Sequence, residues 1–196
     1  GQEMIAELAI DLEQSESYVI TAFGIVGDNN KPFNLLSSSL TQNATNKENV
    51  TIKLMHGVTD APAVDIYANG SLVFENISYG KYSDYVNVEA DNYTIDVKEH
   101  GDDNTVASFD APLNSYGGRS GIVVASGFLN PAEQDSAFAL ILATPNGETL
   151  QLAPVKTDLS LRDEKSITVN DIYSISNYPN PFNPVTSINY SLAKGS

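Results

Sequence analysis

The sequence predicts an all-β protein, and three observations carry that prediction. Ten Tyr and seven Phe supply all the aromatic residues, beside many Val, Ile, Thr and Asn, a composition that favours strands over helices. Several short segments alternate apolar and polar residues with the period of two that a half-buried strand requires. Clusters of Gly, Pro, Asn and Asp separate those segments as turn signals.

Length, charge and cysteine content narrow the possible functions. The 196 residues can form one or two domains, and the absence of Cys excludes disulfides and thiol chemistry. The formal net charge of −15 repels phosphate backbones, so we expect no nucleic-acid partner. No apolar run approaches the roughly 20 residues that span a bilayer, so no transmembrane segment is predicted. The start is unlike a signal peptide, so either one was removed or the chain belongs to a longer protein.

Residues 1–45 are predicted to form a partial β module. We expect two strands, over 18–24 and 33–40, separated by the turn cluster 28–32. The polar, breaker-rich segment 41–49 then leads into the complete central domain, residues 46–155.

The central domain is predicted to open with a strand and a tight corner. Residues 51–54 alternate polar and apolar side chains, as a half-buried strand does. His56 is expected to fix the corner through a hydrogen bond to Asp60 or a nearby carbonyl group, a structural role. Asp60 can cap the turn with its own carboxylate, and Pro62 fixes the backbone there.

A hairpin follows the corner. Asn69 and Gly70 both tolerate positive φ, so this pair predicts a type I′ turn between strands at 64–68 and 72–74. A further strand pair is expected over 85–88 and 93–97.

Residues 1–45 are predicted to repeat part of the central domain. The segment 17–24 aligns with 120–127, and the flanking segments 8–12 and 33–36 align with 109–113 and 138–141. The N-terminal module therefore corresponds to the second half of the central domain without its first half. Such a fragment leaves sheet edges unpaired.

The C-terminal part is predicted to be a linker and an extended strand. Residues 156–174 are taken as a linker, because the chain is polar and charged after Pro154 through Lys165. Within 175–196, three prolines make 175–184 a rigid lead-in to a lone strand at 185–192.

Residues about 50–149 resemble the domain-of-unknown-function family 4397, an extracellular bacterial module often found in tandem. One departure is Gly57-Val58-Thr59, where family members usually carry Ala-Ser-Pro. The resemblance implies an immunoglobulin-like β-sandwich with no established catalytic residues. It rests on Met55-His56, Asp60-Ala-Pro-Ala-Val-Asp-Ile-Tyr67, Asn69-Gly70, Tyr79-Gly80, Asp91-Asn-Tyr93 and Gly121-Ile-Val-Val-Ala-Ser-Gly127.

A second resemblance concerns Asn177-Tyr-Pro-Asn-Pro-Phe-Asn-Pro184 and the strand after it. This motif is similar to the start of the type A C-terminal sorting domain of type IX secretion substrates. The resemblance implies export across the outer membrane of a Gram-negative bacterium and a location outside the cell or on its surface.

No convincing catalytic site emerges, and we expect a protein that is not an enzyme and holds no cofactor. Ser78-Tyr-Gly-Lys81 fits the S-x-x-K pattern of serine acyl-enzymes, but here it lies between strands instead of opening a helix. The acidic loops 28–30 and 102–104 can ligate Ca²⁺ through oxygen atoms, although turn formation explains them as well.

Two functions remain. In the first, the protein is a subunit of an extracellular filament, and the terminal strand of one copy completes the incomplete sheet of the next. Val185, Ile188, Tyr190 and Leu192 would set the register of that strand. In the second, the chain is a module that binds a glycan or a protein ligand. Its candidate contacts are Tyr67, Tyr82 and Tyr85, for which cross-strand packing is an equal alternative.

Overall fold

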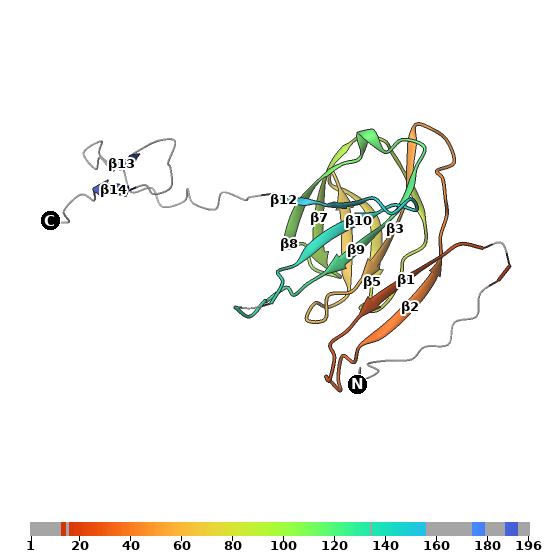
Figure 1. Ribbon diagram of the computed structural model, residues 1–196. Helices are drawn as coiled ribbons and strands as arrows, with labels where there is room; N and C mark the ends of the chain where they lie inside the picture. Colours follow the sequence, from red (N-terminus) through yellow and green to blue (C-terminus); the bar gives the residue numbers. More distant parts are fainter. Residues whose placement is uncertain (1–12, 15, 134, 156–173, 179–186, 192–196) are drawn as a thin grey trace. The chain divides into compact units, whose positions relative to one another are not determined.

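The structure, a computed structural model, describes residues 13–14, 16–133, 135–155, 174–178 and 187–191. It divides the chain into two compact units, Gly1–Val155 and Lys156–Ser196. The helices and strands of the described part are 14 β-strands and one short 3₁₀ helix, Leu113–Ser115, joined by loops and turns (Figure 1). The all-β prediction is therefore confirmed.

Two five-stranded sheets form the main body of the first unit. One sheet has the order β11-β10-β9-β3-β6, with strands Thr149–Gln151, Ala139–Ala143, Ser120–Ser126, Asn49–His56 and Val86–Glu89. The other has the order β12-β8-β7-β4-β5, with strands Ala153–Pro154, Thr105–Pro112, Asn92–Glu99, Val64–Ala68 and Ser71–Ile77.

Apolar side chains from both sheets form one core, so the sheets pack in a sandwich-like arrangement. The predicted alternation holds in β4, where Val64 and Ile66 are buried in that core, and in β7, where Val97 is. The other buried core members on the strands are Val50, Ile52, Leu54, Phe74, Phe109, Ala111, Ala125, Leu140 and Leu142.

The parallel pairing of β3 with β9 joins the first half of the domain to its second half. Thr51 lies opposite Ser120, and His56 opposite Ala125. Every residue of β3 from Val50 onward is buried, including Lys53 on the face that points away from the core. A strand covered on both faces is typical of the centre of a fold.

The sequence predicted one strand too short and missed three others. β3 is longer than its alternating residues indicated, because its non-core face is covered as well. Three strands, β8, β11 and β12, were not predicted. Two of them have three residues or fewer, too short to show a period, and β12 ends in Pro154, which a strand tolerates at an edge.

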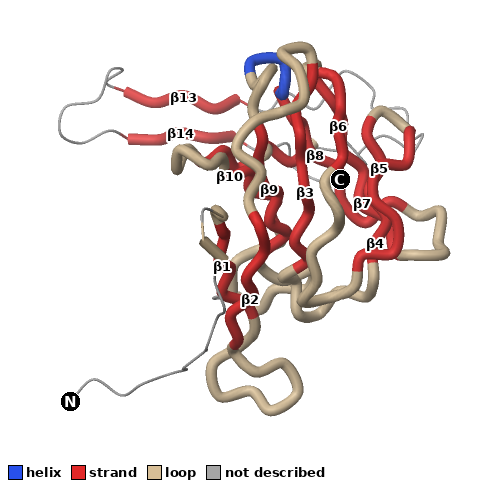
Figure 2. Tube along the Cα trace, turned by 90° about the vertical axis from the view of Figure 1, so that its right-hand side faces the viewer, coloured by secondary structure: helices blue, strands red, loops and turns tan. Residues whose placement is uncertain are grey.

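Two hairpins stand apart from the main sheets. The first pairs β1 (Tyr18–Phe23) with β2 (Asn34–Ser39), as predicted, and it lies beside β3 and β9 in both views (Figures 1 and 2). The second, in the other unit, pairs β13 (Ser174–Tyr178) with β14 (Ser187–Ser191).

The predicted lone strand at the C-terminus is thus corrected to one strand of a hairpin. Ser174–Tyr178, taken from the sequence as linker and rigid lead-in, pairs antiparallel with β14. The three prolines all follow Tyr178, so every residue of β13 retains the backbone N–H that pairing requires.

Replacing Leu54 with Ala should strongly destabilise the domain. This side chain is 1% exposed in the core, and such a truncation costs about 2–5 kcal/mol of the free energy of unfolding. Leu72→Ala is the control, because that side chain is 47% exposed and should change stability by less than about 0.5 kcal/mol. Urea unfolding measures both variants, and equal effects would contradict the packing described above.

Candidate assembly site

The β1–β2 hairpin repeats the geometry of the β9–β10 hairpin, residue by residue. Under the alignment of 17–24 with 120–127, Ala22 corresponds to Ala125, and their partners are Leu35 and Leu140. The agreement extends along the strands. Ile20↔Ser37, Thr21↔Leu36 and Phe23↔Asn34 in one hairpin match Val123↔Leu142, Val124↔Ile141 and Ser126↔Ala139 in the other.

The same glycine geometry ends both first strands. Gly24 has φ +88° and Gly127 has φ +86°, and a Cβ at either position would meet a backbone carbonyl oxygen at 2.1 or 2.3 Å. A side chain therefore cannot be accommodated there, so each hairpin requires glycine at this point. The next residue in each copy donates its N–H across the loop, from Ile25 to Lys31 at 2.8 Å and from Phe128 to Ser136 at 3.0 Å.

The two hairpins differ in what flanks them. β9 pairs with β3 on its other edge, and β10 pairs with β11. In the described part of the chain, β1 and β2 pair only with each other. β9 pairs with β3 on the edge that faces away from β10. The equivalent edge of β1, which faces away from β2, therefore has backbone donors and acceptors suited to a further strand.

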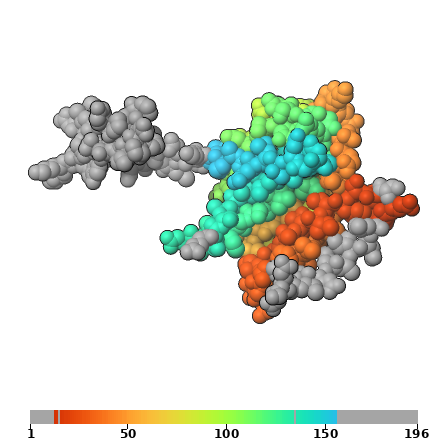
Figure 3. Space-filling model, viewed as in Figure 1, coloured from red at the N-terminus to blue at the C-terminus, as the bar shows by residue number. Residues whose placement is uncertain are grey.

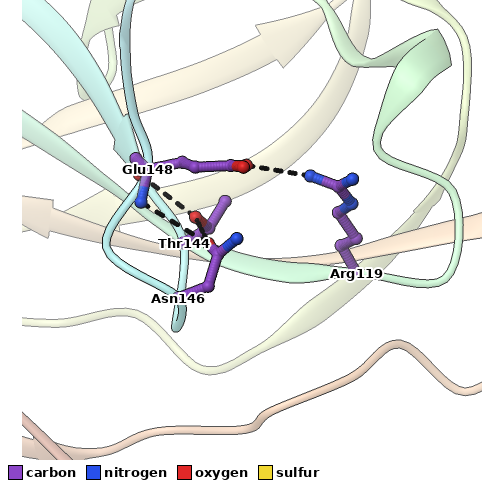
Figure 4. Close-up of polar contacts among 4 residues, drawn as sticks. All are labelled: Arg119, Thr144, Asn146 and Glu148. Atoms are coloured by element: carbon purple, nitrogen blue, oxygen red, sulfur yellow. Dashed lines mark hydrogen bonds and ion pairs between the residues drawn. The ribbon is translucent and has the colours of Figure 1, made fainter.

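The β9–β10 hairpin is the complete copy, because it has a neighbouring strand on each side, β3 and β11. Figure 4 shows the contacts at the turn that leads from β10 into β11. Thr144 Oγ1 donates to Asn146 and to the carbonyl oxygen of Glu148, which closes the tight turn between β10 and β11. The side chain of Glu148 then accepts from Arg119 at 2.9 Å. Both side chains of this ion pair are half-exposed, so it contributes at most about 1 kcal/mol. The turn geometry, not the ion pair, fixes β11.

One face of the β1–β2 hairpin has the character of a sandwich interior. By the repeat, Ile20 and Ala22 occupy the positions of Val123 and Ala125, which face the core in the complete copy. Ile20 is instead 51% exposed. The hairpin lies at the surface of its unit, as the red and orange atoms of Figure 3 show.

The opposite face of the hairpin packs on the outer side of β3 through polar contacts. Thr21 Oγ1 lies 2.6 Å from the hydroxyl group of Tyr82, and Lys53 Nζ donates to Ser38 Oγ at 2.8 Å. Tyr85 accepts from the backbone N–H of Thr41 at 3.1 Å. The ammonium group of Lys53 also lies over the Tyr85 ring, 4.2 Å from its centroid.

These contacts bury a lysine. Burial lowers the pKa of Lys53, and the nearby carboxylate of Asp84 acts in the opposite direction. Two tyrosine rings and a serine hydroxyl group supply the immediate surroundings of this ammonium group. The hairpin is thus held on β3 by a cluster of polar and cation–π contacts.

A third tyrosine, Tyr79, joins the tip of the hairpin to the corner. The rings of Phe23 and Tyr79 meet edge to face, 5.7 Å apart, and Lys31 Nζ lies 4.1 Å from the centroid of the Tyr79 ring. Tyr79 in turn contacts the ring of His56 edge-on at 6.2 Å. The hairpin and the predicted corner are therefore one connected region.

The three tyrosines predicted as ligand contacts do not come together. Tyr82 and Tyr85 lie against the β1–β2 hairpin, where their hydroxyl groups are hydrogen-bonded. Tyr67 belongs to β4 of the other sheet, and Lys98 of the neighbouring strand lies over its ring at 4.7 Å.

The predicted corner residue His56 is buried and bonded to the backbone. Its Nε2 lies 2.9 Å from the carbonyl oxygen of Pro62 and therefore donates to it. Its Nδ1 accepts from the N–H of Val58 at 3.3 Å, which requires the neutral ring. Burial lowers the pKa of His56, although the bond to Pro62 acts in the opposite direction. A neutral imidazole is thus part of the corner.

Asp60 acts across the fold instead of capping its own turn. Its two carboxylate oxygens accept from the N–H groups of Leu129 and Asn130, each at 2.8 Å. Partial burial acts to raise the pKa of Asp60, but the backbone donors from Asn130 and Leu129 outweigh it and hold the pKa below the usual value. Asp60 therefore fastens the corner to the loop between β9 and β10.

Asn69 and Gly70 form the two-residue turn between β4 and β5. Their φ angles are +48° and +79°, the signs that a type I′ turn requires. The Asn69 side chain also accepts from the N–H of Thr94 at 2.8 Å. The pair thus links β4, β5 and β7.

The sequence did not reveal the role of His100. Its Nδ1 lies 2.9 Å from Asp65 Oδ1, a carboxylate that also accepts from the N–H of Asn76 at 2.7 Å. Burial acts to raise the pKa of Asp65, but Asn76 and His100 together lower it. The two partners lie 35 residues apart in the sequence, so no local pattern links them.

The acidic loops form turns through their own carboxylates. Asp28 accepts from the backbone of Asn30 and Lys31, and Asp102 accepts from Asn104. Among the described residues, no three His, Cys, Asp or Glu side chains gather in an arrangement suited to a metal ion.

The strand predicted to mediate assembly is described only in part. Ile188 and Tyr190 belong to β14, opposite Asn177 and Ile175 of β13. Val185 and Leu192 lie outside the described residues, as does the repeat segment 8–12.

The fold and the site together define a β-sandwich domain with an additional hairpin, β1–β2, outside its two sheets. The family described as a domain of unknown function, DUF4397, matches residues 50–170, and the chain belongs to it. The match begins at β3, so it contains neither the β1–β2 hairpin nor residues 171–196. Neither a curated protein nor a solved structure shows significant similarity to the chain. In the described part of the chain, no helix is long and apolar enough to cross a membrane.

The buried His56 should make stability depend on pH near neutrality. Its pKa is lowered on folding, so below the ordinary value of 6.5 the unfolded chain binds more protons and the folded state loses stability. The loss should not exceed about 1.4 kcal/mol per pH unit, the limit for one proton. His56→Gln should flatten urea-unfolding stability between pH 7.5 and roughly 5. An unchanged slope in this variant would contradict the assignment.

Removing the Asp60 carboxylate should loosen the corner. Asp60→Ala leaves two backbone donors without their acceptor and should cost about 1–3 kcal/mol in urea unfolding. Asp60→Asn keeps one oxygen acceptor and should cost less. Asp110→Ala is the matched control, since that carboxylate is exposed on β8. A cost for Asp60→Ala no larger than that of the control would overturn the role given to Asp60.

Proposed function

We propose that this protein is an exported, non-enzymatic structural module that assembles head to tail by strand complementation. The observation that carries the proposal is the edge of β1 that pairs with no other strand among the described residues. That edge corresponds to the edge of β9 on which β3 pairs in the complete copy. Main-chain hydrogen bonds from an added strand would supply affinity, and its side chains would supply register.

The donor is the C-terminal segment of another copy, with Val185, Ile188, Tyr190 and Leu192. A contact between the end of one copy and the beginning of the next is heterologous and does not close on itself, so it generates a filament. Copies of the same chain are thus the proposed partners. The resemblance of 177–184 to a sorting domain supports export to the surface of a Gram-negative bacterium.

The alternative of a glycan- or protein-binding module has less support. Two of its three candidate tyrosines, Tyr82 and Tyr85, use their hydroxyl groups to hold the β1–β2 hairpin. An acyl-transfer enzyme is also disfavoured, since Ser78 and Lys81 lie in the connection between β5 and β6 and no helix places them together.

Deleting residues 185–196 should abolish assembly. Negative-stain images of the full chain should show filaments, and light scattering coupled to gel filtration should show monomers of the shortened chain. A single change, Tyr190→Asp, should weaken assembly because it places a charge on the face of the added strand that also carries Ile188. Asn189→Asp is the matched control, because it adds the same charge on the opposite face of that strand. Filaments that persist without 185–196 would refute the proposal.

A further inference from the structure

The β13–β14 hairpin has the strand arrangement that the incomplete module lacks. In the complete copy, β10, β9, β3 and β6 follow one another across the sheet, with β3 parallel to β9 and antiparallel to β6. β2 and β1 repeat β10 and β9. β14 and β13 form an antiparallel pair, as β3 and β6 do.

We propose that the donated element is this whole hairpin, bound in one defined register on β1 of a second copy. The resulting sheet has the order β2-β1-β14-β13, in which β14 runs parallel to β1 and takes the place of β3, while β13 takes the place of β6. This inference rests on the proposed assembly function and specifies its partner surface. It differs from donation of a lone strand because β14 remains paired with β13 throughout.

The register follows from the repeat. Positions 52, 54 and 56 of β3 lie opposite Gly121, Val123 and Ala125 of β9. The corresponding positions of β1 are Tyr18, Ile20 and Ala22. The apolar residues of the donor segment also recur at every second position, as Ile188, Tyr190 and Leu192. Within β14, Ile188 and Tyr190 can lie opposite two of these β1 positions in two parallel registers. The strand predicted from the sequence extends to Leu192, and setting Ile188, Tyr190 and Leu192 opposite Tyr18, Ile20 and Ala22 selects the register that brings Tyr190 to Ile20.

The distribution of charge favours the same occupant. Residues 1–155 carry six basic and 21 acidic side chains, so the entire net charge of −15 lies in the unit that contains β1. Residues 156–196 carry four of each sign and are neutral. Two copies of the acidic unit repel each other, whereas the neutral segment approaches β1 without that penalty. The second copy therefore presents its C-terminal unit, not another acidic face.

Cysteine pairs test the register cleanly, because the chain has no Cys of its own. The protein carrying Ile20→Cys is mixed with the protein carrying Tyr190→Cys and treated with a short bismaleimide. Covalent dimers should form in this mixture and disappear when Asn189→Cys replaces Tyr190→Cys, since neighbouring residues of a strand point to opposite faces. Filaments that form without the Ile20–Tyr190 cross-link would overturn the register and leave strand complementation standing.

A locked hairpin tests the second part of the inference. Ile175 lies opposite Tyr190 in the β13–β14 pairing, so Ile175→Cys combined with Tyr190→Cys allows a disulfide to hold the hairpin closed. The oxidised protein should assemble as well as the reduced one. Assembly that is lost on oxidation and restored on reduction would show that β14 must separate from β13, which overturns this inference but not the proposed function.

Salt dependence completes the test. Repulsion between acidic units is screened by salt, so raising the ionic strength from low values to about 0.15 M should increase the fraction in filaments. A fraction that falls over this range would indicate an ion-paired contact between copies and would overturn the role given to the neutral hairpin.

Discussion

The parallel pairing of β3 with β9 is the constraint on which the rest of the domain depends. Sixty-three residues, 57–119, separate these strands in sequence, and β4 to β8 lie within that segment. The core-facing side of β3 supplies Val50, Ile52 and Leu54 to the sandwich interior. Its other side supplies Lys53, whose burial requires the β1–β2 hairpin above it. One strand thus anchors both the core and the candidate assembly site.

The same pairing explains why the β1–β2 hairpin is of functional interest. The β1–β2 and β9–β10 hairpins have the same strand register, down to a glycine with positive φ at the same point of each hairpin. What differs is the neighbouring strand, which the complete copy provides from its own chain. Any exposed strand edge can pair with a further strand. For β1, the pairing of β3 with the equivalent edge of β9 also indicates how such a strand would be oriented. This geometry gives strand direction and register as well as location.

In the corner at residues 56–62, the sequence identified residues that do stabilise the fold, but it did not identify all of their partners. His56, Asp60 and Pro62 were expected to stabilise their own turn, and His56 does bond to the Pro62 carbonyl group. Asp60, however, bonds to the backbone of Leu129 and Asn130, about 70 residues away. Likewise, Tyr82 and Tyr85 were grouped with Tyr67 by sequence proximity, but they belong to the contact with β1–β2. Local patterns identify polar groups that need partners without identifying the partners.

The sequence by itself determined the all-β class, the strands predicted at 18–24, 33–40 and 64–68 to within a residue at each end, and the Asn69-Gly70 turn, because alternation and turn chemistry are local properties. Four features could be seen only in the tertiary structure. They are the parallel pairing of β3 with β9, the burial of Lys53, the Asp65–His100 pair and the positions of β11 and β12. Each of these depends on residues distant in the chain, or on strands too short to have a period. The structure also shows a β13–β14 hairpin where a lone terminal strand was expected, since β14 pairs with a segment that the sequence pattern had assigned, apart from Ser174, to a rigid lead-in.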